Sequence, residues 1–398
     1  MILFFLSSGL LLGWSLGANH AANVFGTAVG TKMLRFKTAA LTCGVFVILG
    51  AVFSGRGAAN TLESLGSVNA LAGSFMVALS TAFTVFWMTR LKLPVSTSQA
   101  IVGAIIGWNF YTDSLTDYNS LIKIVGSWIA CPILSAALAI GIFYAVRSYL
   151  NRAKIHLLRM DTYTRAGLLI VGAFGSFSLG ANNIANVMGV FVPAAPFNDL
   201  DVYGLFTFTG TQQLFLLGGL SIAIGVYTYS RRVMTTVGIS LMKLSPVAAL
   251  IAVLSQALVL FLFSSEALES GLHSLGLPAI PLVPVSSSQA IIGAIIGIGL
   301  AKGGRSIRYR VLGEIAAGWV IAPIIAGIVT FVALFFLQNV FNQEVGRKTA
   351  FTVSQPAFEY ACDEDVCGVR RNDARTQDWD RQDNRQGSVR YSEVEQAE

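Results

Sequence analysis

The sequence predicts an all-α polytopic membrane protein built from two inverted-topology repeats with broken or re-entrant helices. The 398 residues are 54% hydrophobic and only 12% charged, with a mean hydropathy of +0.65, whereas soluble domains carry about 25% charged residues. Of the 21 acidic residues, 12 follow position 342, so the preceding chain is apolar with scattered basic residues. Several blocks of the first half also recur in the second half.

Apolar segments that suit a membrane helix of about 20 residues follow one another along the chain. The first lacks a basic leader and runs directly into a polar motif, so we expect it to be retained rather than removed as a signal peptide. The expected segments are 2–25, 39–55, 71–91, 94–108, 121–146, 166–190, 211–229, 245–263, 283–300 and 311–340. Two of them, 94–108 and 283–300, are short, and the sequence leaves open whether they cross the membrane or fold back.

Basic residues between the segments predict the orientation, since they concentrate on the cytoplasmic side. The basic residues fall on one side if every segment crosses once, and this arrangement places both termini outside the cytoplasm. We expect the protein in the plasma or inner membrane. They also sit singly between apolar runs, which excludes a nucleic-acid-binding surface. The expected organisation is a first repeat (1–146), a basic cytoplasmic linker (147–165), a second repeat (166–342) and a hydrophilic, disordered tail (343–398).

Three blocks recur in the same order, which indicates an internal duplication. PVSTSQAIVGAIIG (94–107) recurs as PVSSSQAIIGAIIG (284–297), SLGANHAANVFG (15–26) as SLGANNIANVMG (178–189), and SWIACPI (127–133) as GWVIAPI (318–324). The spacing between copies grows from the SLGANHAANVFG block to the PVSTSQAIVGAIIG block. We therefore expect an insertion in the second half that includes 231–244. Inverted repeats with short or broken segments are typical of secondary transporters, which bind substrate between the halves.

The polar heads of the short segments suit an anion. A proline followed by hydroxyl residues is a helix start, and the free N–H groups and positive dipole end there attract an anion without a formal charge. The candidate anion-binding residues are Ser96, Thr97, Ser98, Gln99, Ser286, Ser287, Ser288 and Gln289. The alternative is that these residues and the glycines after them serve only interhelical packing.

The asparagine motifs suit a cation. Asn19 and Asn23, and likewise Asn182 and Asn186, are four residues apart, so each pair shares one helix face. Amide and backbone carbonyls in an unwound helix can ligate sodium. The alternative is interhelical hydrogen bonding by the amides.

The paired motifs resemble those of the inorganic phosphate transporter (PiT) family, which has a GANDVAN-type signature and a PVS(T/S)-containing hairpin in each half. The resemblance covers residues 5 to 340. It implies an inverted-repeat fold, cation-coupled phosphate transport and a homodimer. It also implies that Asn19, Asn23, Asn182 and Asn186 match the sodium-site asparagines, and that Ser96–Gln99 and Ser286–Gln289 match the anion-binding hairpins.

One departure from the family is the acidic residue after GAN, which is His20 in the first copy and Asn183 in the second. The loss of both carboxylates weakens the case for sodium and removes repulsion against an anion. Histidine titrates near physiological pH. We therefore include His20 and Asn183 among the cation-coupling candidates, with His20 as the proton-coupling group or an anion contact. The alternative is a neutral histidine that only packs.

The predicted function is secondary active import of inorganic phosphate by proton or sodium symport through alternating access. A sulfate transporter of the same family and a passive anion channel are the alternatives. An enzyme is disfavoured, because no carboxylate accompanies the single intramembrane histidine of the motifs. No cofactor is expected beyond sodium as a coupling ion, and a local Cys362–Cys367 disulfide is allowed if the tail lies outside.

Overall fold

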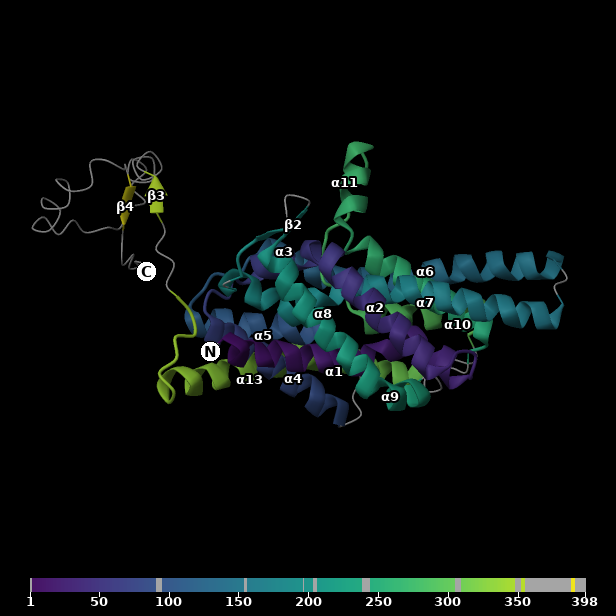
Figure 1. Cartoon of the computed structure of the whole chain (residues 1–398), viewed down its shortest axis with the longest axis horizontal. Coiled ribbons are helices and arrows are strands. Elements are labelled where there is room, and N and C mark those ends of the chain that lie inside the picture. Colours follow the sequence, from purple (N-terminus) through teal and green to yellow (C-terminus); the bar gives the residue numbers. More distant parts are fainter. Residues whose placement is uncertain are drawn as a thin grey trace, which may run out of the picture. The chain divides into compact units, whose positions relative to one another are not determined.

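The computed structural model describes residues 2–90, 95–153, 156–195, 197–202, 206–237, 244–304, 309–347, 352–354 and 388–390. The chain separates into two compact units, Met1–Gly346 and Arg347–Glu398. The described residues of the second unit form two paired antiparallel strands, β3 (Thr352–Ser354) and β4 (Ser388–Arg390). Cys362 and Cys367, with the predicted disulfide, lie outside the described residues. The first unit contains the long apolar helices and all the predicted site residues (Figure 1).

Apart from the short, amphipathic α3, the helices of the first half are mostly apolar around their whole circumference, as expected for segments surrounded by lipid or by other helices. They are α1 (Ile2–Gly30), α2 (Phe36–Ser54), α3 (Arg56–Leu65), α4 (Leu71–Arg90), α5 (Thr97–Thr112) and α6 (Tyr118–Ala153).

The second half repeats this order with additions. It comprises α7 (Leu157–Met188), the 3₁₀ helix η1 (Gly189–Ala194), β1 (Leu200–Val202), β2 (Phe206–Phe208), α8 (Gly210–Thr228), α9 (Ser230–Val237), α10 (Pro246–Leu262), α11 (Glu266–Ser274), α12 (Ser287–Ala301) and α13 (Tyr309–Asn339). Strands β1 and β2 pair in antiparallel register. Helix α11 buries none of its residues and projects from the bundle (Figure 1).

The additional residues of the second half do not include 231–244, so this prediction was wrong. The spacing between copies is 163 at Asn19 and Asn182, 174 at the starts of α2 and α8, and 190 at the starts of α5 and α12. The extra residues therefore lie in two places, between α7 and α8 and between α10 and α12. Helix α9 falls within the predicted stretch, but it occupies the place of α3 in the repeat.

Among the described residues, seven helices are long and apolar enough to cross a membrane, and the bent pair α10–α11 raises this to eight. Helices α5 and α12 have 16 and 15 residues, about 24 Å and 23 Å, which is short of a hydrocarbon layer of about 30 Å. Helix α5 runs antiparallel to α4, because Trp108 near the end of α5 lies against Gly73 near the start of α4. Next to it, Asn109 donates to the carbonyl of Leu65, the last residue of α3. Neither α5 nor α12 is therefore long enough to cross the hydrocarbon layer as a straight helix by itself.

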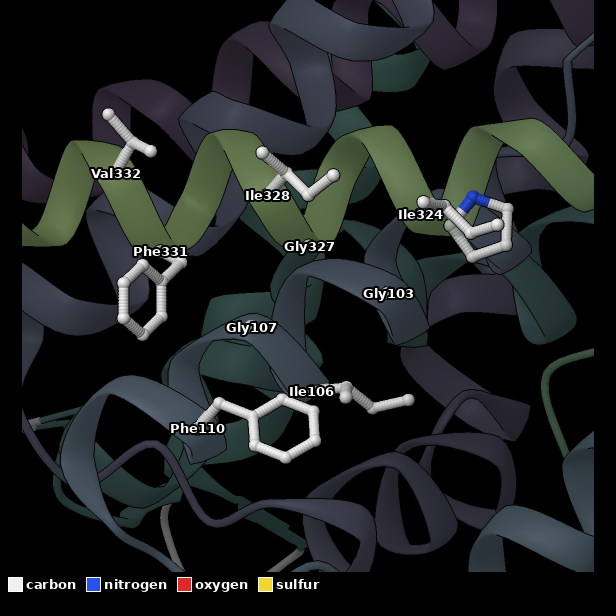
Figure 2. A pocket seen from close by; sticks show the side chains of 10 residues that line it. Gly103, Ile106, Gly107, Phe110, Ile324, Gly327, Ile328, Phe331 and Val332 are labelled. Atoms are coloured by element: carbon white, nitrogen blue, oxygen red, sulfur yellow. The ribbon is translucent and has the colours of Figure 1, made fainter.

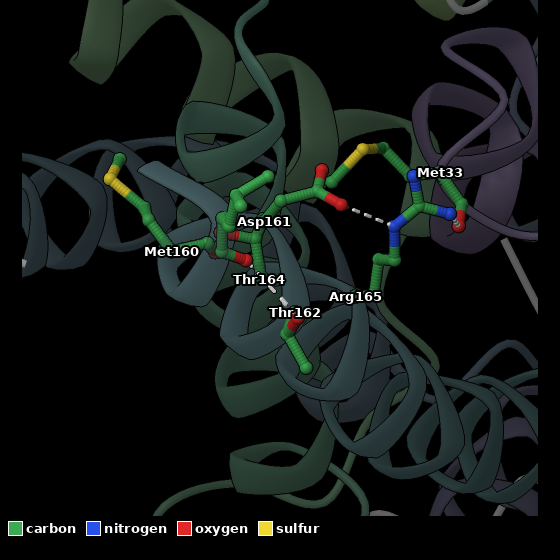
Figure 3. A network of polar contacts seen from close by, with 7 residues as sticks. Met33, Met160, Asp161, Thr162, Thr164 and Arg165 are labelled. Carbon is green, nitrogen blue, oxygen red and sulfur yellow. Dashed lines mark hydrogen bonds and ion pairs between the residues drawn. The ribbon is translucent and has the colours of Figure 1, made fainter. Parts of the chain in front are cut away.

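Most of the described residues of the expected basic linker 147–165 belong to helices. Helix α6 continues to Ala153 and α7 begins at Leu157. A helix of 36 residues is about 54 Å long, so its end must extend beyond the hydrocarbon layer. Arg165 pairs with Asp161 at 2.8 Å and donates to the Met33 carbonyl at 2.9 Å (Figure 3). This contact ties the start of α7 to the turn that follows α1.

The two halves interdigitate. Helix α1 packs on α8 and α7 on α2, while α5 packs on α13 and α12 on α6. At Gly103 and Gly293 the backbones approach so closely that an added Cβ would overlap the carbonyl oxygens of Pro323 and Pro132, respectively. Each half thus supplies the packing partners of the other. Beside the contact of Gly103, an apolar groove opens between α5 and α13 (Figure 2), and it contains none of the predicted site residues.

The residues that follow α13, at the start of the expected tail, pack against the helix bundle. Val345 is buried, and its carbonyl accepts a hydrogen bond of 2.8 Å from the Trp108 indole. A buried indole N–H needs an acceptor, and the segment after α13 supplies one.

Candidate anion- and cation-binding site

The site is built at the starts of α5 and α12. Ser96 and Ser286 are the N-caps of these helices, and their hydroxyls accept hydrogen bonds from the Gln99 and Gln289 backbone N–H groups at 3.4 Å and 3.3 Å. The two serines are therefore helix caps, and because each hydroxyl uses only its oxygen as an acceptor, its O–H can still donate. The helices begin after the caps and not at the prolines; Pro94 lies outside the described residues.

His20 joins the two helix starts. Its Nδ1 lies 2.6 Å from the Ser287 hydroxyl, and its Nε2 lies 3.4 Å from the Thr97 hydroxyl. Thr97 and Ser287 are the first residues of α5 and α12, and all three side chains are buried. The positive ends of two helix dipoles therefore converge on one imidazole in the middle of the bundle.

A second network ties α7 to both helix starts. The Asn182 amide donates to the Val285 carbonyl at 2.7 Å and accepts from the Val285 N–H at 2.9 Å. The Asn186 amide donates to Ser98 Oγ at 2.8 Å, and Ser98 donates to the same Val285 carbonyl at 3.1 Å. Both ends of the Asn182 amide are thus occupied by backbone, which was not predicted from the sequence.

Asn183, the residue that takes the place of His20 in the second copy, turns away from the helix starts. It donates to the Leu179 carbonyl at 3.0 Å and its Oδ1 accepts from Asn186 at 3.2 Å. His20 has no equivalent partner from α7, so the central imidazole makes the site asymmetric.

Asn19, Asn23 and Ser288 are half-buried and take no part in these networks. Asn19 donates to the Ser15 carbonyl of its own helix at 3.0 Å. Within the described part of the chain, no hydrogen bond joins Asn19 or Asn23 to Asn182 or Asn186.

Three buried amide oxygens of the site lack a hydrogen-bond partner within the described part of the chain. They are Gln99 Oε1, Gln289 Oε1 and Asn186 Oδ1. Buried carbonyl oxygens normally have a partner, since leaving one unpaired costs about 1–3 kcal/mol. These atoms are free to accept from a bound group or to face a cation.

The site contains no side chain with a permanent formal charge among the described residues. No Asp, Glu, Lys or Arg is buried among the described residues, and His20 is the one buried histidine. The same residues contain no cluster of three or more His, Cys, Asp or Glu that could hold a metal ion. The site therefore offers an anion two helix dipoles, and it offers sodium only neutral oxygens.

Supporting contacts that the sequence did not reveal hold α12 against α6. Ser135 donates to the Ala290 carbonyl at 2.6 Å, and the Cys131 thiol lies 3.8 Å from the Ser286 carbonyl. The repeated blocks SWIACPI in α6 and GWVIAPI in α13 indicated that this region is duplicated, but they did not predict these hydrogen bonds.

The chain matches the phosphate transporter family over residues 16–278 and 280–379. It is 32% identical over 317 residues to a candidate phosphate permease of Methanocaldococcus jannaschii, covering 80% of this chain and 91% of that protein. It is 29% identical over 343 residues to the sulfate permease CysP of Bacillus subtilis, covering 84% and 88% of the two chains.

A solved structure described as a sodium-dependent phosphate transporter has the same fold. Its TM-score is 0.66 at 21% identity, covering 85% of this chain and 98% of that one. The long apolar helices and the family match together make this a multi-pass membrane protein. The paired helix starts lie at matching places in the two halves of this chain. Together with the match over nearly the whole length, they show that the chain belongs to the phosphate transporter family.

Proposed function

We propose that this protein imports inorganic phosphate by cation symport through alternating access. The observation that carries the proposal is the convergence of the α5 and α12 starts on His20, in a core without a buried carboxylate. An oxyanion held there would meet helix N-termini, the Thr97 and Ser287 hydroxyls and no opposing negative charge. Gln99 and Gln289 lie within the first turns of the same helices.

For the coupling ion we favour the proton, with His20 as its carrier. His20 is placed between two hydroxyls of the anion site, so its charge and the charge of a bound anion would stabilise each other. Sodium at Asn19, Asn23, Asn182 and Asn186 is the alternative. It is supported less well, because the Asn182 oxygen already accepts from Val285 and no carboxylate is available to balance the ion.

Sulfate is the second candidate substrate, and the similarity to a sulfate permease favours it. The unpaired oxygens of Gln99, Gln289 and Asn186 argue for phosphate. Protonated phosphate has O–H groups that can donate to these acceptors, whereas sulfate at neutral pH has none. A site with buried acceptors discriminates against a ligand that leaves them unpaired.

The remaining proposals concern assembly and placement. We place the protein as a homodimer in the plasma or inner membrane, with both termini outside the cytoplasm and with the basic ends of α6 and α7 inside. Impermeant labelling of a single cysteine placed at Arg152 or at Glu266, on intact cells and on inverted vesicles, tests this orientation.

The test of function is uptake of radiolabelled phosphate or sulfate into proteoliposomes under an imposed proton or sodium gradient. We expect accumulation of phosphate driven by the proton gradient. His20→Gln keeps hydrogen-bonding capacity but removes the titratable group, so it should abolish proton-driven accumulation. His156→Gln is the matched control, because His156 is exposed at the start of α7. Accumulation driven only by sodium, or intact proton-driven accumulation in His20→Gln, would refute the proton assignment. Equilibration without accumulation would indicate a channel.

A further inference from the structure

At one end of the site lies a hydrogen-bond network that includes Asn182, Asn186, Ser98 and the Val285 backbone. Three groups converge on Val285: the Asn182 amide through two hydrogen bonds, and the Ser98 hydroxyl, which Asn186 supports. All four residues are at most 1% exposed. The backbone before α12 is therefore fastened to both α7 and α5.

The internal repeat assigns a counterpart to every member of this network. At the spacing of 163, Asn182 and Asn186 correspond to Asn19 and Asn23, and at the spacing of 190, Ser98 and Val95 correspond to Ser288 and Val285. The counterpart network would fasten the backbone at Val95, before α5, to α1 and α12. Residue types are the same at each of these positions.

The counterpart network is not formed. Asn19 donates instead to Ser15 of its own helix, and no hydrogen bond joins the side chain of Asn23 or Ser288 to another described residue. Asn19, Asn23, Ser288 and Val95 are each half-buried, whereas their partners in the repeat are fully buried.

The four matched residues have the same hydrogen-bonding capacity at both ends, and the one unmatched neighbour is Asn183, whose Oδ1 accepts from Asn186 and whose counterpart is His20. A symmetric exchange would break bonds at Val285 and form bonds of the same kind at Val95. Such an exchange has a small net free energy, since the donors and acceptors are matched, and this is what a two-state element requires.

We infer that Asn182 and Asn186 with Ser98 close one end of the site in this state, and that Asn19 and Asn23 with Ser288 close the other end in the opposite transport state. The inference rests on the proposed transport function and assigns these asparagines as positioning residues that hold hairpin backbone. With the orientation predicted from the basic residues, the closed end faces outward and the open end faces the cytoplasm.

Thiol labelling at two matched reporter positions outside the networks tests the inference. Thr27 lies one turn beyond Asn23 on α1 and is half-buried, while its counterpart Val190 is 4% exposed. Single cysteines at Thr27 or Val190 are introduced in a full-length background with Cys362 and Cys367 changed to serine; Cys43 and Cys131 are buried. Labelling rates with a small membrane-impermeant thiol reagent are measured in detergent, with and without phosphate.

We expect the thiol at position 27 to react at least tenfold faster than the thiol at position 190 in the otherwise unchanged protein. Asn182→Ala should raise the rate at position 190 several-fold and lower the rate at position 27. Asn19→Ala, the matched control, removes a bond of the opposite state, so it should not raise labelling at position 190. Equal rates at the two reporters, or a rise at position 190 in Asn19→Ala, would overturn the inference.

Two further measurements keep the test decisive. If Asn182→Ala does not yield folded protein, Ser98→Ala removes one bond to the Val285 carbonyl and should change the labelling in the same direction. Binding of phosphate and sulfate to the unlabelled protein is measured separately by calorimetry. Loss of binding to both anions would refute the proposed function and leave the labelling contrast intact, whereas binding without the contrast would refute the closure alone.

Discussion

The contacts of Gly103 with Pro323 and of Gly293 with Pro132 predict that Gly103→Ala and Gly293→Ala destabilise the protein equally. In an unobstructed helix, alanine is favoured over glycine by about 1 kcal/mol. Here the added methyl would overlap a backbone carbonyl oxygen, and neither helix can yield by a side-chain rotation. Overpacking of this kind costs about 1–3 kcal/mol, and separation of the helices would also strain the nearby helix starts. The net effect is a loss of up to about 2 kcal/mol for each variant.

Gly141→Ala in α6 is the matched control, because an added Cβ at Gly141 meets no atom within 4 Å. This variant should be as stable as the unchanged protein or slightly more stable. Thermal unfolding of the purified proteins in one detergent measures all three variants. The reasoning is refuted if Gly103→Ala or Gly293→Ala unfolds at the same temperature as Gly141→Ala. Unequal losses in the two variants would contradict the equivalence of the α5–α13 and α12–α6 contacts.

Two other predictions concern the ends of the helices. Trp108→Phe leaves the buried Val345 carbonyl without its donor, so it should cost about 1–3 kcal/mol and expose the segment after α13 to limited proteolysis. Hydrogen bonds from the Ser120 hydroxyl and from the Asn119 and Ser120 N–H groups lower the pKa of Asp117 below its ordinary value of 3.8. The stabilisation by Asp117 is therefore present above that value and lost as pH falls through the lower folded-state pKa. Asp117→Ala should reduce the unfolding temperature at pH 7, and the difference from the unchanged protein should shrink in acid.

The sequence predicted the features of the fold that depend on local pattern. The apolar runs located the long helices, and the copied motifs identified the starts of α5 and α12 to within a few residues. The position of the insertion was missed, because no copied motif covers 231–244 and its polar character resembled an added segment. The helical continuation of α6 and α7 was missed because Arg147–Arg165 was interpreted only as a charge signal, although charged residues are compatible with a helix beyond the bilayer.

The components of the site were also visible in the sequence, but not their connections. Ser96 and Ser286 were recognised as part of a helix start, and the structure shows that their hydroxyl oxygens cap the two helices. The bridge from His20 to Thr97 and Ser287 joins residues 77 and 267 positions apart. Such a contact depends on how the two halves interdigitate, which a motif cannot specify.

The asymmetry of the site is the feature that the sequence was least able to predict. Because the two copies have nearly the same residues, any assignment by motif gives Asn19 and Asn182 the same role. The structure gives them different partners, Ser15 on the same helix and Val285 across the bundle. A protein with two equivalent closures cannot use both at once and still exchange its ligand with solvent. The near-identity of the copies keeps the two closed states close in free energy. His20 is present in one copy only, and it lies at the centre of the site between the two ends. The repeat therefore fits a protein whose ends alternate around a fixed imidazole, and exchanging His20 and Asn183 between the copies should move the centre without removing either closure.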